Sequence, residues 1–384
     1  MRLYALALLF FSANSILNVI IPLRSEALGA NNTIIGLIMG AYMLTCMFFR
    51  PWAGQMIHRY GPILVLRILL IVNGCALVLY TFTGLEGYAA ARILQGICTA
   101  FFSMALQIGI IDALPEEQRS QGLSLYSLFT YMPTIIGPLL AISIWEGGGM
   151  NGFTLAMIGI ALITAVFGYS VPMQGAPQHG EAGGERSVMK EALRAGANNR
   201  PLLLCGALML SLSVVFGAVT AFVPLYAKEV SGGNAGFYLM LQALVIVLTR
   251  FVLAKRIPSD GIWHARFVGV VCTLGAVGVL LLSLSVAWGL GVFYAAAVMI
   301  GAAQALLYPT LTTYLTFVLP HLYRNVLIGL FIATADLGVS LGGLAMGPIA
   351  DGVTYSGMYA VCAVLALLAA LLAVMSGGKR RINV

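Results

Sequence analysis

The chain has 384 residues, of which 60% are hydrophobic and only 9% are charged, and its mean hydropathy is +0.98. So few charged side chains cannot cover a water-facing surface of this size, which excludes a soluble globular protein. The formal net charge of +7 does not indicate a nucleic-acid partner, because apolar runs of about 20 residues recur from end to end. The composition therefore predicts an all-α polytopic membrane protein.

Twelve membrane-spanning helices are expected, and one long polar connection divides them into two bundles of six. We expect an N-terminal bundle over residues 1–173, a cytoplasmic linker over 174–200, a C-terminal bundle over 201–376 and a basic cytoplasmic tail over 377–384. The first apolar run lacks a small-residue cleavage site and is interpreted as an uncleaved helix. The predicted spans are 3–24, 32–50, 62–83, 88–111, 121–145, 152–172, 201–227, 235–254, 264–286, 289–317, 325–350 and 355–376.

The two halves of the sequence repeat each other. Three landmarks recur at offsets of 200 to 205 residues, and a six-plus-six parallel repeat is a known plan for transporters, with the substrate site between the halves. The matching pairs are Pro22-Leu23 with Pro224-Leu225, Arg50 and Gly61 with Arg250 and Gly261, and Leu114-Pro115 with Leu319-Pro320.

The positive charges indicate the orientation of the chain. With these spans, 17 of the 20 Lys and Arg residues fall on one side of the membrane, leaving Arg24, Arg92 and Lys228 elsewhere. Basic residues concentrate on the cytoplasmic side of membrane proteins, so we expect both termini in the cytoplasm and the protein in the cell membrane. The six cysteines lie in apolar runs without a CxxC pair, and we interpret them as packing residues rather than disulfides or metal ligands.

The fourth predicted span carries a single charge, Arg92, near its middle. An Arg in hydrocarbon costs about 2.5–3.5 kcal/mol on insertion scales, so it should face a protein interior or a watery cavity. Polar residues follow it at helical spacing and extend one stripe along the helix: Gln95, Thr99, Ser103 and Gln107. The alternative is a structural Arg that only pairs with a neighbouring helix.

Two segments resemble motifs of the major facilitator superfamily. Arg92-Ile-Leu-Gln95-Gly96 resembles the fourth-helix motif RxxQG, and the segment from Gly54 to Gly61 resembles the loop motif GxxxD(R/K)xGR. The second match has His58 in the acidic position and is followed by Pro62 where a basic residue is expected. The resemblance implies an intracellular latch formed with Arg50 and Arg59, weaker or pH-sensitive because of His58; a plain tight turn is the alternative.

The fifth predicted span is similar to the antiporter motif of the drug/proton branch of that superfamily. Gly137-Pro138 and Ala141 match the motif, whereas Pro133 stands where an earlier Gly is expected. Pro interrupts the backbone hydrogen bonds and Gly permits close helix approach, so this segment is expected to bend between two states, with Gly338 as its counterpart. An ordinary proline kink is the alternative.

Asp336, in the middle of the eleventh predicted span between Thr334 and Ser340, is the candidate for proton coupling. Removal from water favours the neutral carboxyl, which makes it a suitable proton carrier or a partner for a cationic group. The alternative is a carboxyl satisfied by neighbouring hydroxyls, and the sequence leaves open whether it pairs with Arg92. Other candidate cavity residues, which serve equally well as hydrogen-bonding contacts between helices, are Asn14, Asn18, Arg24, Tyr131, Tyr238, Gln242, Gln304 and Tyr308.

The resemblance implies a monomeric secondary transporter that works by alternating access, needs no cofactor or metal, and exchanges protons for a small solute. Two arginines, Arg24 and Arg92, are accompanied by only one acid in the spans, Asp336. This charge balance favours an anionic or zwitterionic solute, such as an opine-type metallophore. A proton-coupled importer of a sugar or organic acid is the first alternative. A membrane-embedded enzyme or sensor is disfavoured, because the spans contain no nucleophile–base pair and no loop is long enough for a sensory domain.

Overall fold

The computed structural model describes residues 2–170, 194, 196, 198–253, 256–258, 260–320 and 323–378, and every regular element in these ranges is a helix. This confirms the predicted all-α class. The chain divides into two compact units, residues 1–180 with 235–240 and residues 181–234 with 241–384. Most of the predicted linker 174–200 and of the tail 377–384 lies outside the described residues, so the proposed domain boundaries stay a prediction.

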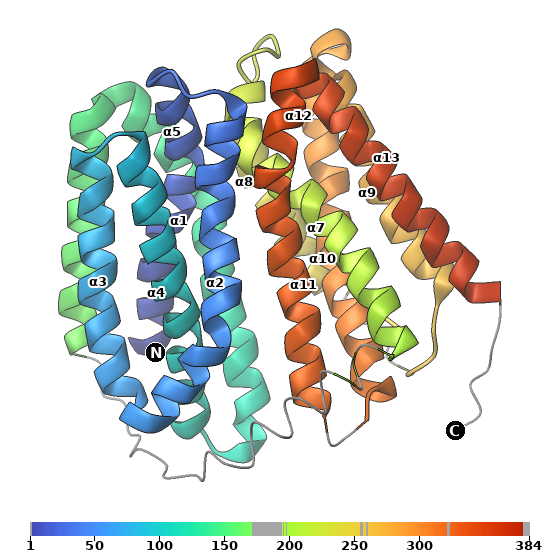
Figure 1. Cartoon of the computed structure of the whole chain (residues 1–384), viewed down its shortest axis with the longest axis horizontal. Coiled ribbons are helices and arrows are strands. Elements are labelled where there is room, and N and C mark those ends of the chain that lie inside the picture. The colour runs from blue at the N-terminus through green and yellow to red at the C-terminus, as the bar shows by residue number, and fades with distance from the viewer. Residues whose placement is uncertain are drawn as a thin grey trace. The chain divides into compact units, whose positions relative to one another are not determined.

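The first unit is a bundle of long helices that run side by side (Figure 1). Within it α1 packs along α5, whereas α4 packs against both α2 and α3. Asn31 caps the start of α2 by accepting a hydrogen bond from the Ile34 N–H at 3.0 Å. The helices are α1 (Arg2–Ala27), α2 (Asn32–Tyr60), α3 (Pro62–Phe82), α4 (Leu85–Asp112) and α5 (Glu116–Tyr169).

The second unit repeats this packing with the later helices. Its α7 packs along α11, and α9 packs along both α10 and α13. Asn199 caps α7 as Asn31 caps α2, by accepting from the Leu202 N–H at 3.0 Å. The remaining elements are α7 (Arg200–Tyr226), α8 (Ala235–Leu253), α9 (Ala265–Trp288), α10 (Leu290–Val318), α11 (Arg324–Leu344), α12 (Met346–Val353), α13 (Tyr355–Met375) and the short helix η2 (Ser376–Gly378). Of these, only the start of α8, residues 235–240, is assigned to the first unit.

Eleven of the described helices are long and apolar enough to cross a membrane, against twelve predicted spans. The difference lies in α5, which contains both predicted spans 121–145 and 152–172. Its backbone leaves helical geometry at Gly149, where φ is 51° and ψ is −137°, a conformation that glycine adopts readily. The predicted break is therefore present, and α5 consists of two helices that meet at Gly149.

The structure corrects the loop predicted between the second and third spans, because most of that segment is helical. α2 continues to Tyr60, so Gly54 and Arg59 lie on its last turns rather than in a loop, and the side chain of His58 lies outside the described residues. The chain reverses through Gly61 alone, whose φ of 81° favours glycine, and Pro62 starts α3 with the fixed φ suited to a first helical turn. A helix can continue into polar sequence past the membrane, and that is why hydropathy placed the boundary too early.

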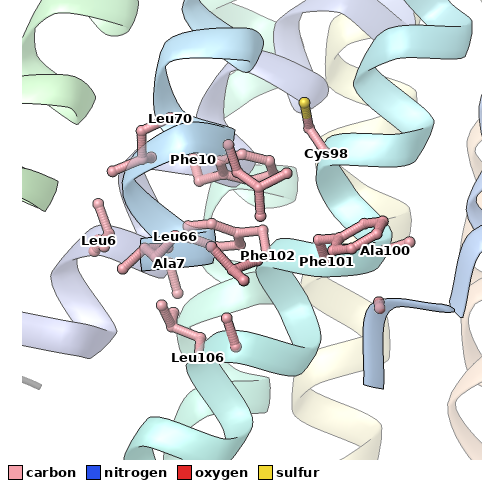
Figure 2. Packing of buried hydrophobic residues seen from close by; sticks show 14 of the residues in the cluster. Leu6, Ala7, Phe10, Leu66, Leu70, Cys98, Ala100, Phe101, Phe102 and Leu106 are labelled. Carbon is pink, nitrogen blue, oxygen red and sulfur yellow. The ribbon is translucent and has the colours of Figure 1, made fainter. Parts of the chain in front are cut away.

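The core of the first unit is a cluster of buried aromatic and aliphatic side chains, part of which Figure 2 shows. The rings of Phe10 on α1 and Phe102 on α4 stack with centroids 3.8 Å apart and planes 7° apart. Buried Leu66 and Leu70 of α3 belong to the same cluster. Five of the six cysteines are buried, as expected for packing residues, whereas Cys75 is exposed on α3.

The internal repeat appears in two close helix contacts, one in each half. A side chain at Gly96 of α4 would collide with the Tyr42 carbonyl of α2, and one at Gly301 of α10 would lie 2.8 Å from the Gln242 carbonyl of α8. The residues of the two contacts are related by offsets of 205 and 200, the same offsets as the sequence landmarks. Gly96 and Gly301 thus allow equivalent helix pairs to approach closely in each half.

Candidate functional site

The candidate site of the first unit is built around the Arg92 side chain, which is 0% exposed. Gly96, one turn further along α4, lets α2 approach, and the aromatic ring of Tyr42 then lies with its centroid 5.5 Å from the guanidinium carbon. The negative face of an aromatic ring stabilises a cation at this distance. The arrangement places a fixed positive charge inside the bundle.

Four of the five guanidinium N–H groups have acceptors, and each acceptor is neutral. Nη1 donates to Asn14 Oδ1 at 3.1 Å and to Gln95 Oε1 at 3.4 Å. Nη2 donates to Asn18 Oδ1 at 3.1 Å and to Met39 Sδ at 3.4 Å. The remaining Nε–H is buried and has no partner among the described residues. The structure therefore brings together four predicted site residues, Asn14, Asn18, Arg92 and Gln95.

Two further hydrogen bonds hold this group in place. The Tyr80 hydroxyl donates to Gln95 Oε1 at 3.0 Å, so the Gln95 carbonyl accepts from both Tyr80 and Arg92. The Tyr42 hydroxyl donates to Thr99 Oγ1 at 3.0 Å. Each residue of the RxxQG motif thus has a physical role, since Arg92 supplies a buried charge, Gln95 accepts from it and orients it, and Gly96 permits a close helix contact.

No carboxylate contacts Arg92 in the part of the chain that the structure describes. The sequence explains this, because the first six predicted spans contain no Asp or Glu at all. Burying a charge without a counter-charge is expensive, since neutral acceptors replace only part of its hydration. A site of this kind is suited to an anion, which would supply the missing charge.

Ser103 and Gln107, the members of the predicted polar stripe farthest from Arg92, make contacts of their own. Ser103 is buried and donates to the Ala100 carbonyl at 3.2 Å. Gln107 forms a hydrogen bond with Tyr126 of α5. Fifteen residues separate Gln107 from Arg92, about 22 Å along a helix, so Gln107 is not part of the group around Arg92.

A second group of predicted residues lies on α8 and α10. The Gln242 Nε2 amide donates to Gln304 Oε1 at 3.2 Å. Tyr238 is buried one turn before Gln242. Tyr308 lies one turn after Gln304, and its ring is 6.0 Å from that of Phe331 on α11. Of these residues, Gln242 and Gln304 contact each other, as residues that line a site or join two helices would.

Asp336 lies near the middle of α11 and is 9% exposed. It is the only carboxylate within the twelve predicted spans. Ser340, one turn later, is fully buried. Gly338 faces α7, since a side chain there would collide with Ser213. Asp336 is thus almost entirely removed from solvent.

The predicted gating residues lie at helix ends and at a close crossing. The crossing is between α1 and α5, where Ser15 Oγ donates to the Pro133 carbonyl at 2.9 Å and would collide with any side chain at Gly137. Pro138 and Tyr131 flank this contact on α5. The half-buried Arg24 is in the last turn of α1, and the half-buried Arg50 precedes the polar end of α2.

Residues that contribute to these contacts and were not predicted include Ser15, Met39, Tyr42 and Tyr80. Met39 and Tyr42 are three residues apart on α2 and therefore share a helix face. Nothing in the sequence distinguishes them from packing residues, because their role depends on which helix is adjacent to α4.

Comparison with known proteins gives consistent results. Residues 3–288 match the profile of the family described as Major Facilitator Superfamily. The chain is 53% identical over 372 residues to the staphylopine export protein of Staphylococcus aureus (strain Mu50 / ATCC 700699), covering 96% of this chain and 93% of that protein.

More distant matches agree on the fold. An uncharacterized MFS-type transporter, YhhS of Escherichia coli O157:H7, is 21% identical over 395 residues, covering 97% of this chain and 92% of that protein. The crystal structure of the nucleoside transporter NupG aligns with a TM-score of 0.79 at 12% identity, covering 99% of this chain and 99% of that chain.

Proposed function

Because this chain belongs to the major facilitator superfamily, we propose that it is a proton-coupled exporter of a small anionic or zwitterionic solute. The solute we propose is an opine-type metallophore, and staphylopine is the compound that the relative at 53% identity is named for exporting. The chain is a multi-pass membrane protein and not an enzyme. The importer of a sugar or organic acid remains an outcome of the test below.

The observation that carries the proposal is the buried charge of Arg92 among neutral acceptors. A lipophilic cation would be repelled by such a site, whereas a carboxylate would neutralise it. Electrostatic interactions are strong where water is excluded, so one matched charge pair contributes substantially to selectivity. A metallophore with several carboxylates has the chemistry that this site favours.

Asp336 is the proposed proton carrier. The group around Arg92 contains no Asp, Glu or His, and Asp336 is the only acid in the predicted spans. In the proposed cycle, Asp336 takes a proton from outside and releases it to the cytoplasm, and its two charge states favour opposite orientations of the carrier. The binding energies of proton and solute then drive the exchange without ATP.

The close glycine contacts support two rocking bundles. Gly137 permits contact with Ser15, and Gly338 permits contact with Ser213 in the corresponding helix pair of the second unit. We propose that α5 and α11 bend or slide at these contacts while each bundle core stays packed. The proposed orientation has both termini in the cytoplasm, and the proposed functional unit is a monomer in the lipid bilayer.

The test is solute-driven proton movement in inside-out membrane vesicles with an acidic lumen and a trapped pH-sensitive dye. Addition of staphylopine to the outside of wild-type vesicles should dissipate the gradient, and Asp336→Asn should abolish this effect. Asp351→Asn is the matched control, because Asp351 is an exposed carboxyl on the adjacent helix α12 and should leave exchange unchanged.

Three results would contradict the proposal. Dissipation that persists in Asp336→Asn would place the proton site elsewhere. Proton movement driven by lipophilic cations but not by staphylopine would overturn the substrate class. Solute accumulation in right-side-out vesicles, driven by an acidic exterior, would replace export with import.

A further inference from the structure

One face of α1 next to Arg92 is partly exposed. Between residues 13 and 23 every side chain of α1 is buried except those of Asn14 and Asn18, which are partly exposed. The two residues are one turn apart and therefore share a helix face. An amide facing lipid would lose its hydrogen bonds, so two amides at the only accessible positions indicate a water-accessible face. The Arg92 side chain behind them is 0% exposed and does not reach this face.

Arg92 determines which end of each amide faces outward. An Asn side chain has one carbonyl oxygen and one NH₂ group, at opposite corners of a flat amide. In both Asn14 and Asn18 the oxygen accepts from the guanidinium at 3.1 Å. The guanidinium has donors only, so the reversed amide would place donor against donor. Both NH₂ groups are therefore directed away from Arg92.

We propose that the amide NH₂ groups of Asn14 and Asn18, and not Arg92 itself, contact the anionic group of the solute. Arg92 is then a positioning residue that fixes both amides as donors and adds a positive charge behind them. The chemical class recognised is an oxyanion, with a carboxylate as the group that fits two adjacent N–H donors. This inference rests on the proposed function, since it assigns the contact that an anionic solute would make.

This arrangement explains why the residues beside the buried charge of Arg92 are neutral amides rather than carboxylates. A carboxylate at position 14 or 18 would neutralise Arg92 and leave no charge for the solute. An amide conveys the charge instead, because hydrogen bonding of its oxygen to a cation polarises its N–H groups. Hydrogen bonds from such donors to an anion are shorter and stronger than those between neutral groups.

The discriminating substitutions are Asn14→Asp and Asn18→Asp. Each keeps an oxygen acceptor for Arg92, so a purely structural contact between α1 and α4 would be kept or strengthened. Each also removes the donor and adds a negative charge where the anion would bind. We expect affinity for staphylopine to fall by at least about tenfold, while the melting temperature without ligand stays at or above that of wild type. The measurement is isothermal titration of the purified full-length protein in detergent.

Asn31→Asp is the control for the same chemical change outside the site. Asn31 is exposed at the start of α2, and Asp is an equally good helix cap, so both binding and stability should match wild type. The positioning role of Arg92 is tested by Arg92→Lys, since one ammonium group cannot hold both amide oxygens in the same geometry. We expect it to reduce the preference for staphylopine over its carboxamide analogue, a ratio that a general loss of folded protein would not change.

The results separate this inference from the proposed function. If wild type binds staphylopine and the Asp variants bind it equally well, the amides do not contact the anion and the inference is wrong. It is also wrong if the Asp variants lose binding only in proportion to a lowered melting temperature. If wild type binds no anion, the proposed substrate class has failed, together with the inference that rests on it, before any variant is compared.

Discussion

The side-chain amide of Gln242 on α8 donates to the side-chain oxygen of Gln304 on α10 over 3.2 Å. The equivalent positions in the first half, at offsets of 200 and 205 residues, are Tyr42 and Thr99, whose hydroxyls are 3.0 Å apart. Each half thus has one polar bridge at the same place between equivalent helices, although the residues differ. In each half, the bridge joins the same two helices as the close glycine contact, which is at Gly96 in the first half and at Gly301 in the second.

The first prediction concerns the bridge between Gln242 and Gln304. Gln242→Leu or Gln304→Leu alone leaves one amide without its partner and should lower the free energy of unfolding by about 1–2 kcal/mol. The double variant should lose less than the sum, with a coupling energy of about 0.5–1 kcal/mol. Denaturation of purified protein in mixed detergent micelles measures all four forms. Strictly additive losses would mean that the two amides do not interact.

The second prediction concerns the equivalent close helix contacts at Gly96 and Gly301. Gly96→Ala and Gly301→Ala should each destabilise the protein by about 1–3 kcal/mol, because the added methyl group collides with a carbonyl of the facing helix. Gly159→Ala is the matched control. It lies in α5 with no other atom within 4 Å of the added carbon, so it should be neutral or stabilise by up to about 1 kcal/mol. Thermal unfolding in detergent distinguishes these outcomes.

The third prediction separates structure from function at Arg92. Arg92→Met removes a buried charge that no described carboxylate balances, so stability should be unchanged or raised by up to about 2 kcal/mol. Transport of an anionic solute should nevertheless be lost. Arg67→Met, on the exposed Arg67 at the start of α3, should leave transport intact. A strongly destabilised Arg92→Met protein would show instead that Arg92 mainly holds the bundle together.

The fourth prediction concerns acid stability near the start of α9. The hydrogen bond from His264, at 2.8 Å, lowers the pKa of the Asp260 carboxyl below its ordinary value, and the Ile262 N–H contributes. A carboxyl with a lowered pKa in the folded state stabilises the protein above its unfolded pKa of about 3.9 and loses this effect as the pH falls through the folded value.

Asp260→Asn should therefore lower the melting temperature slightly at neutral pH, and this difference from wild type should disappear as the pH falls through the folded-state pKa of Asp260. The effect should be small, because both side chains are exposed. Melting curves between pH 3 and 7 measure it, with Glu146→Gln as a control at another exposed carboxyl. A difference that persists unchanged at low pH would contradict the assignment.

Hydropathy and composition predicted most of the fold, because a bilayer demands helices of a certain length. They failed at the end of α2, where the helix continues past the membrane to Tyr60 and a single residue, Gly61, reverses the chain. They correctly divided α5 into two spans, because its backbone leaves helical geometry at Gly149. The end of α2, by contrast, depends on local backbone geometry, which hydropathy does not contain.

The candidate site was predicted in part. An isolated Arg in a membrane span is conspicuous, so Arg92 and its polar stripe were found, and Asn14 and Asn18 followed from their spacing. Tyr42 and Tyr80 were missed, since contacts across 57 and 15 residues depend on which helices are neighbours. Gln107 was grouped with Arg92 because one helix face continues along α4, although its partner is Tyr126.

The neutral surroundings of Arg92 also determine how the membrane potential acts on the protein. One elementary charge moved across the full potential corresponds to about 2.3 kcal/mol per 100 mV, and Arg92 carries such a charge without a described carboxylate beside it. Any displacement of α4 along the field is therefore sensitive to voltage when the site is empty. A bound monoanion cancels the charge of Arg92, so the contribution of Arg92 to voltage sensitivity is expected in the steps without solute.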